Sequence, residues 1–112
     1  MASHRVLSAP GLAHVRPRPF DVALDGYVWL PRMIDKARAW RAGTLGAYVY
    51  PCPIDCTCLG LLGIDAETFA DVATAAADDA EVLAVLLARG IPAACEAAFD
   101  PVDLERRLHE AA

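Results

Sequence analysis

Prolines and glycines divide this chain into short segments, and this spacing constrains its fold more than any other feature. Pro31 and Pro53 each stand where a helix can begin, because proline suits the first helical position and needs no backbone hydrogen bond there. Gly43, Gly63 and Gly90 stand where a helix can end, since glycine suits the residue after the last turn. The segments between them have room for about three helical turns each. We therefore expect several short helices and no long one.

The segment from Pro31 to Gly43 carries the clearest helical pattern. Its apolar residues recur with the 3.6-residue period and predict one buried face, made of Trp29, Leu30, Met33, Ile34, Ala37 and Trp40. The opposite side is predicted to face solvent and carries Arg32, Asp35, Lys36, Arg38 and Ala39. The pattern predicts an amphipathic helix with a wide buried face.

Acidic residues that precede apolar segments predict further helix starts, because a carboxylate accepts hydrogen bonds from the free N–H groups of a first turn. The expected helices are a short one that Pro51 and Pro53 open and that runs to about Leu62, a helix after Asp65, a helix from Asp78 or Asp79 to Arg89, a short helix from Pro92 to Ala98, and a terminal helix after Asp100. Residues 44–50 are rich in strand-forming residues but have no partner strand, so an irregular or extended connector is expected. The predicted fold class is all-α, a compact single-domain bundle of about four to six short helices.

Residues 1–24 are predicted to form an extended arm in front of a helical domain at 25–112. Pro17 and Pro19 favour a polyproline-like backbone around Arg16 and Arg18. A Pro-containing extended segment of this kind can also serve as a ligand for a protein partner.

Composition excludes several classes of protein. With 112 residues, of which 56% are hydrophobic, the chain has material for one core. A net charge of -5 argues against binding to nucleic acid or to acidic membranes. There is no apolar run near the roughly 18–20 residues that span a bilayer, and no signal-peptide pattern. We expect a cytoplasmic protein with reduced cysteines, whose partner is another protein or a second copy of itself.

The charged residues of the first predicted helix are the main candidates for a binding site. Their spacing places them side by side on one helical surface. The full candidate set is Arg32, Asp35, Lys36, Arg38, Tyr48, Tyr50 and Asp55. Three interpretations stay open: a solvated surface with weak ion pairs, a structural clamp, and a site for a small anionic ligand.

Three cysteines, Cys52, Cys56 and Cys58, lie close together in sequence. Three thiols can approach one Zn²⁺ ion, which then needs a fourth ligand such as Cys95, His4, His14 or His109. The spacing is not that of paired C-x2-C motifs, and cysteine is often a small buried apolar residue. Packing, metal binding and redox use therefore remain alternatives. No cofactor is predicted, with zinc as the lesser possibility.

One stretch resembles a known family. Residues 26–38 read GYVWLPRMIDKAR, and 42–46, 52–55, 61–65 and 79–85 add shorter similarities. Over about residues 25–90 the chain resembles a small bacterial family known only as a domain of unknown function, number five-zero-six-nine. Cys56 and Cys58 depart from the expected pattern, and the segment after Gly90 matches poorly. The resemblance implies one helical domain and no established activity.

The leading functional hypothesis is a small binding or accessory module without catalytic activity, which can form homo-oligomers. It follows from the short length and from the absence of a complete catalytic motif. A second hypothesis is a small enzyme or ligand-binding protein that uses Arg32, Asp35 and Lys36 with Asp55. A third is a thiol-based metal or redox protein that uses Cys52, Cys56 and Cys58. Whether the chain is an enzyme is left open by its sequence.

Overall fold

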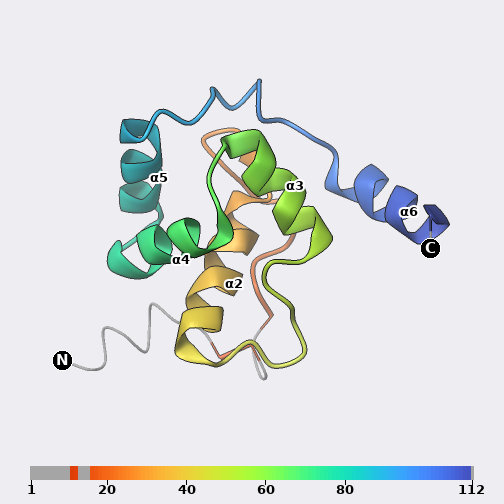
Figure 1. Ribbon diagram of the computed structural model, residues 1–112, viewed down its shortest axis with the longest axis horizontal. Coiled ribbons are helices and arrows are strands. Elements are labelled where there is room, and N and C mark those ends of the chain that lie inside the picture. Colours follow the sequence, from red (N-terminus) through yellow and green to blue (C-terminus); the bar gives the residue numbers. More distant parts are fainter. Residues whose placement is uncertain (1–10, 13–15, 112) are drawn as a thin grey trace.

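The computed structural model describes residues 11–12 and 16–111, and this part contains a small β-hairpin and five helices (Figure 1). The hairpin pairs β1 (Ala23–Leu24) with β2 (Tyr27–Val28) in antiparallel register. The helices are α2 (Leu30–Ala42), α3 (Pro53–Leu62), α4 (Ala66–Ala75), α5 (Asp79–Ala88) and α6 (Pro101–Ala111). The predicted all-α class with short helices is confirmed, and the hairpin is an addition that was not predicted.

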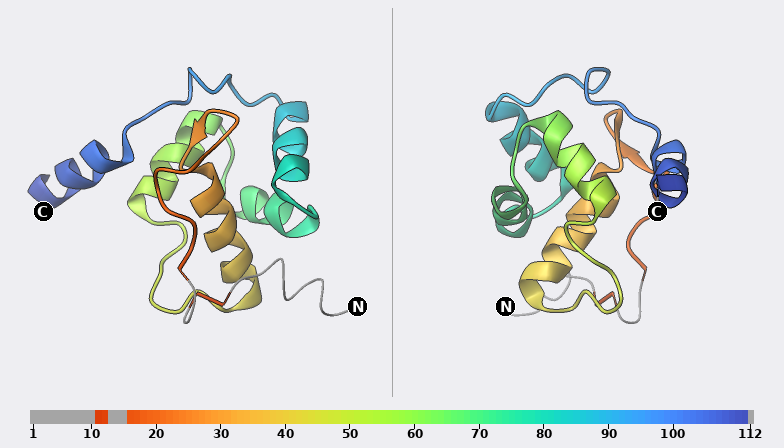
Figure 2. Two further views of the ribbon diagram at one scale, coloured as in Figure 1. Left: turned by 180° about the vertical axis from the view of Figure 1, so that it is seen from behind. Right: turned by 45° about the vertical axis from the view of Figure 1, so that its right-hand side comes forward.

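Helix α2 begins and ends where the sequence predicts. Pro31 occupies its first turn, and Gly43 follows its last turn with φ 73° and donates to the carbonyl groups of Ala39 and Trp40. Trp29 precedes the helix with φ 70°, a left-handed conformation that a bulky residue rarely adopts. The other helices contact α2 or one another, and α4 packs against α2 most extensively (Figures 1 and 2).

The prediction that one side of α2 faces solvent is wrong at Lys36, Arg38 and Ala39, which are all buried. The helix is therefore enclosed around most of its circumference. The reason is that elements from several parts of the chain pack around it, which a one-dimensional pattern does not reveal. Trp40, predicted to be buried, is only partly so, and its ring lies 5.4 Å from the ring of Tyr50.

The remaining caps follow the sequence closely. Asp65 accepts from the N–H of Thr68 at 2.7 Å and starts α4. Asp78, rather than Asp79, is the cap of α5 and accepts from the N–H of Glu81 at 2.9 Å. The largest fully enclosed apolar side chains form one core, made of Phe69, Leu30, Met33, Ile34, Leu86 and Val82.

The predicted helix from Pro92 to Ala98 is wrong. This segment forms turns, and it runs along the body of the molecule toward α6 (Figure 2). Tyr27 donates its hydroxyl hydrogen to the carbonyl oxygen of Pro92 at 2.7 Å, and Ala97 is buried. These tertiary contacts hold the segment in an extended path that a free helix would not follow.

Candidate functional site

The most enclosed polar group of the described structure is a pair formed by Lys36 on α2 and Asp55 on α3. Lys36 Nζ donates to Asp55 Oδ2 at 2.7 Å, and the two side chains are 4% and 0% exposed. Trp29 Nε1 donates to the other carboxylate oxygen of Asp55 at 2.7 Å. A buried charge is stable only when it is paired and hydrogen-bonded, and both conditions are met here.

Local structure at the start of α3 holds Asp55 in place. Cys52 is the N-cap, and its backbone N–H donates to Asp55 Oδ2 at 2.9 Å. In return, the N–H of Asp55 donates to Cys52 Sγ at 3.4 Å, which completes a capping box with sulfur in the place of the usual hydroxyl. The carboxylate thus connects the hairpin end at Trp29, helix α2 and helix α3.

The thiol of Cys52 also contacts the lysine. Lys36 Nζ lies 3.3 Å from Cys52 Sγ, within the longer hydrogen-bond distance that sulfur allows. Cys52 is partly exposed as a residue, whereas Lys36 beside it is buried. Lys36 is the one lysine among the ten Lys and Arg residues of the chain.

Arg32 lies one turn before Lys36, between two aromatic rings. Its guanidinium carbon is 5.4 Å from the ring centre of Trp29 and 5.6 Å from that of Tyr48, a cation–π arrangement. Its Nη1 donates to the carbonyl oxygen of Arg18 at 3.3 Å. Its buried Nε has no hydrogen-bond partner in the part of the chain that the structure describes.

Asp35, another member of the candidate set, does not share a cation with Asp55. It instead binds Arg18, whose Nε and Nη2 donate to the two carboxylate oxygens at 3.0 Å each. Arg18 also donates to Asp79 through Nη1 and, at 3.1 Å, through Nη2. The hydrogen bond from Arg18 keeps the pKa of Asp79 below its usual range, and the same hydrogen bond raises the pKa of Arg18.

The sequence analysis placed Arg18 in the predicted arm, which could bind a protein partner. It did not predict the ion pairs of Arg18 with Asp35 and Asp79, which we call the Arg18 clasp. The residues next to Arg18 in sequence do not indicate these ion pairs, because Asp35 and Asp79 lie on helices 17 and 61 residues away. An arginine between prolines, which has a stiffened backbone, is the only hint that the sequence offers.

Arg38 contributes to the fold at the end of α4. Its Nε donates to the carbonyl oxygen of Ala73 at 2.8 Å and its Nη2 to that of Ala76 at 3.4 Å. Cations are favourable beside the free carbonyl groups of a helix end. Burial lowers the pKa of Arg38, an effect that the carboxylates nearby oppose.

The two tyrosines of the candidate set separate. Tyr48 stands over Arg32, whereas Tyr50 is buried and donates its hydroxyl hydrogen to the carbonyl oxygen of Ala66 at 2.7 Å. Burial raises the pKa of Tyr50. The structure therefore gathers Lys36, Asp55 and Cys52 in one group and Arg32 with Tyr48 beside it, while Asp35, Arg38 and Tyr50 lie elsewhere.

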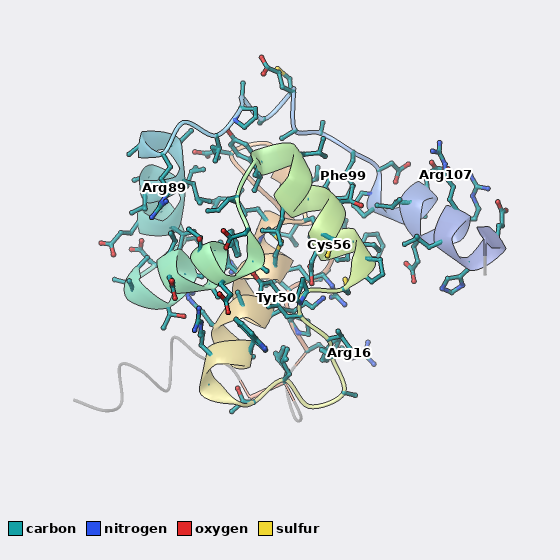
Figure 3. The ribbon with its side chains drawn as sticks, in the orientation of Figure 1. Arg16, Tyr50, Cys56, Arg89, Phe99 and Arg107 are labelled. Atoms are coloured by element: carbon teal, nitrogen blue, oxygen red, sulfur yellow. The ribbon has the colours of Figure 1, made fainter. Side chains whose placement is uncertain are left out.

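The three neighbouring cysteines have different surroundings. Cys52 is partly exposed, and Cys56 on α3 is exposed (Figure 3). Cys58 is buried, and this burial raises the pKa of its thiol to about 12. Within residues 11–12 and 16–111, no three or more His, Cys, Asp or Glu side chains are placed to hold a metal ion. The predicted ligands His4 and His14 lie outside the described residues.

Among the surface hollows of the described structure, one lies beside these charged groups and another lies at the end of α3. One, of about 660 Å³, is wide open and is lined by the Arg18, Asp35, Arg38 and Asp79 side chains. The other, of about 380 Å³, lies between the end of α3 and Pro92. None of the helices described is long and apolar enough to cross a membrane.

Comparison with known proteins identifies the family of the chain. No curated protein matches it in sequence. The family described as "Domain of unknown function (DUF5069)" matches residues 14–99, a longer stretch than the resemblance over about residues 25–90 predicted. The match includes Arg18, the hairpin and helices α2 to α5, and it stops before α6. The chain therefore belongs to the DUF5069 family.

Proposed function

We propose that the chain is a small binding or accessory module without catalytic activity, and that α6 is its protein-binding element. One observation carries the proposal: α6 projects from the body (Figure 1), which it contacts through α3 and Leu104, and its apolar residues Val102 and Leu108 are 54% and 38% exposed. A projecting helix with exposed apolar side chains is a common means of recognising a protein partner. The helix also lies beyond the segment shared with the family.

The internal use of the charged residues supports a non-catalytic role. A general acid or base must come within hydrogen-bond distance of a substrate. Lys36 and Asp55 are enclosed and bound to each other, and Arg38 is bound to the end of α4. These groups connect helices, which is the structural-clamp interpretation of the sequence pattern. The four free cysteines support a reducing compartment such as the cytoplasm as the location.

A second copy of the chain is the partner that the charges of α6 favour. Asp103 and Glu105 precede Arg106 and Arg107 along the helix, Glu110 follows them, and both arginines also pair with Asp103 within the helix. In an antiparallel pair of such helices, the acidic part of one lies opposite the basic part of the other. A symmetric dimer of this kind presents the same surface on both sides. Because the helix is short, we propose a weak association.

Sedimentation velocity over a wide range of concentrations tests this proposal. We expect the sedimentation coefficient of the wild type to rise with concentration. The double variant Val102→Glu/Leu108→Glu should remain monomeric, while His109→Glu, which adds charge on the same helix, should behave more like the wild type. Limited proteolysis of the monomer adds a second measurement.

The outcomes separate the two parts of the proposal. A wild type that is monomeric throughout, with α6 readily cleaved, would exclude self-association and leave α6 available to another protein. A monomer whose α6 resists cleavage would show that the helix belongs to the body, and the proposed role of α6 would be wrong.

A second candidate function is binding of a small anionic ligand at Arg32. The buried Nε without a partner in the described structure favours it, because such a donor is costly to leave unpaired. Thermal melts with phosphate, sulfate and small carboxylates test it. Stabilisation of the wild type that is lost in Arg32→Gln but kept in Arg107→Gln would support binding. Equal melts with every anion would exclude it.

A further inference from the structure

We infer that Lys36 and Cys52 form a covalent sulfur–nitrogen crosslink when the protein meets a peroxide. This would be a modification site, beyond the binding role proposed above. The starting geometry is the 3.3 Å approach of Lys36 Nζ to Cys52 Sγ. A bond between these atoms would join the middle of α2 to the first turn of α3.

Both atoms are held in place before any reaction. Lys36 is fixed by Asp55 and lies with its Nζ 5.9 Å from the centre of the Trp29 ring. Cys52 is fixed by its capping hydrogen bonds at the start of α3. Reactions between two groups that the fold holds in contact are strongly accelerated, because folding has already removed their translational and rotational freedom.

The choice of residue at position 36 points the same way. All the other Lys and Arg residues of the chain are arginines. The one lysine is the buried residue that contacts a thiol. An arginine can pair with a carboxylate at least as well as a lysine can. Only the lysine can lose its proton and act as a nucleophile, since a guanidinium stays protonated in proteins.

Exposure selects Cys52 as the thiol that begins the reaction. Cys52 is a partly exposed residue, so a small peroxide can approach it from solvent. Cys56 and Cys95 are more exposed, but neither has a hydrogen bond from an amine in the described structure. Cys58 is buried, and the raised pKa of its thiol disfavours the reactive thiolate.

The reaction proceeds in two steps. In the first, the sulfur of Cys52 attacks the peroxide; the O–O bond breaks, a sulfenic acid forms, and the peroxide is reduced by two electrons to an alcohol or water. In the second, the ammonium of Lys36 gives a proton to Asp55, 2.7 Å away, and the neutral amine attacks the sulfur. The S–O bond breaks, and the hydroxyl leaves as water with a second proton from the nitrogen. One peroxide is consumed for each crosslink.

The product has a structural effect that a simple oxidation would lack. The crosslink fixes α2 to α3 and removes the positive charge of Lys36. Asp55, which then carries the proton, keeps its contacts with Trp29 and Cys52. A thiol that attacks the sulfur would reverse the bond, so the site would respond to the redox state of its surroundings.

Intact-mass spectrometry and peptide mapping test the inference. The reduced full-length chain is treated with hydrogen peroxide, and a variant with Cys56→Ser, Cys58→Ala and Cys95→Ser is treated alongside it. This variant retains one thiol, so it cannot form a disulfide within the chain. We expect a loss of two hydrogen atoms in both, a peptide linking position 36 to position 52, and recovery of the original mass with dithiothreitol.

Two further variants identify the reacting atoms. Cys52→Ser removes the sulfur, and Lys36→Arg keeps a positive charge beside Asp55 but supplies no nucleophilic amine. Both should fail to form the crosslink. Circular dichroism shows which variants fold, and the peptide map of the wild type decides the matter if the variant with one thiol does not. Oxygen addition at Cys52 without a linked peptide, or the same linked mass in Lys36→Arg, would overturn the inference.

Discussion

Asp55 accepts hydrogen bonds from Lys36 and Trp29 on its two different oxygens, each at 2.7 Å. Lys36→Met would leave this enclosed carboxylate without its counter-charge. We expect a loss of about 3–5 kcal/mol in the free energy of unfolding at neutral pH, measured by urea denaturation. Adding Asp55→Asn should recover part of the loss, because the unpaired charge is then gone. Arg107→Met, at an exposed position of α6, is the control and should change little. If Lys36→Met lowers the free energy of unfolding no more than Arg107→Met does, the pair does not stabilise the fold.

Arg18→Lys should weaken the clasp between the arm, α2 and α5. A lysine carries the charge but lacks the fork that binds two carboxylates at once. Since the side chain of Arg18 is 36% exposed, we expect a moderate loss of about 1–2 kcal/mol in denaturant titrations. Arg16→Lys, an exposed neighbour, should be neutral. Equal effects of the two substitutions would contradict a specific role for Arg18.

The stability of the protein should depend on the ionisation of Asp79 in acid. The folded state lowers the pKa of Asp79 from its ordinary value of 3.8, first through the hydrogen bond from Arg18. A lowered folded pKa adds stability that is present above the unfolded value and is lost as the pH falls through the folded value. Melting temperatures measured between about pH 2 and pH 6 should therefore fall more steeply in the wild type than in Asp79→Asn. Parallel curves for the two proteins would contradict this.

Phe69 and Trp40 offer a comparison of two aromatic side chains. Phe69 is fully enclosed, whereas Trp40 is only partly buried. Phe69→Ala should cost about 3–5 kcal/mol, and Trp40→Ala should cost less despite its larger ring. Urea titrations of both variants would check the order. The reverse order would mean that Trp40 is more important to the core than its exposure indicates.

Much of the helix pattern could be predicted because helix ends depend on nearby residues. Pro31, Gly43 and Gly63 act on the backbone beside them, and Asp65 acts on an N–H three residues later. The confirmed helices α2 to α6 all have such local signals. The segment after Pro92 had a similar signal but follows tertiary contacts instead.

Much of the candidate site could not be predicted, for the opposite reason. Burial of Lys36 depends on Asp55 and Trp29, which come from two other parts of the chain. The helical period placed Lys36 on a polar surface because it contains no information on what packs there. The sequence did identify Lys36 and Asp55 as candidates, but only the fold assigns them to each other.

The partnership of Arg18 with Asp79 also bears on how fast the molecule forms and comes apart. The two residues are 61 positions apart in sequence, with the hairpin and three helices between them. Closing so long a loop costs chain entropy before the contact gives anything in return. We expect the contact to form after the main folding barrier has been crossed. Losing it would then accelerate unfolding and leave the folding rate nearly unchanged, so that the arm governs the lifetime of the native state.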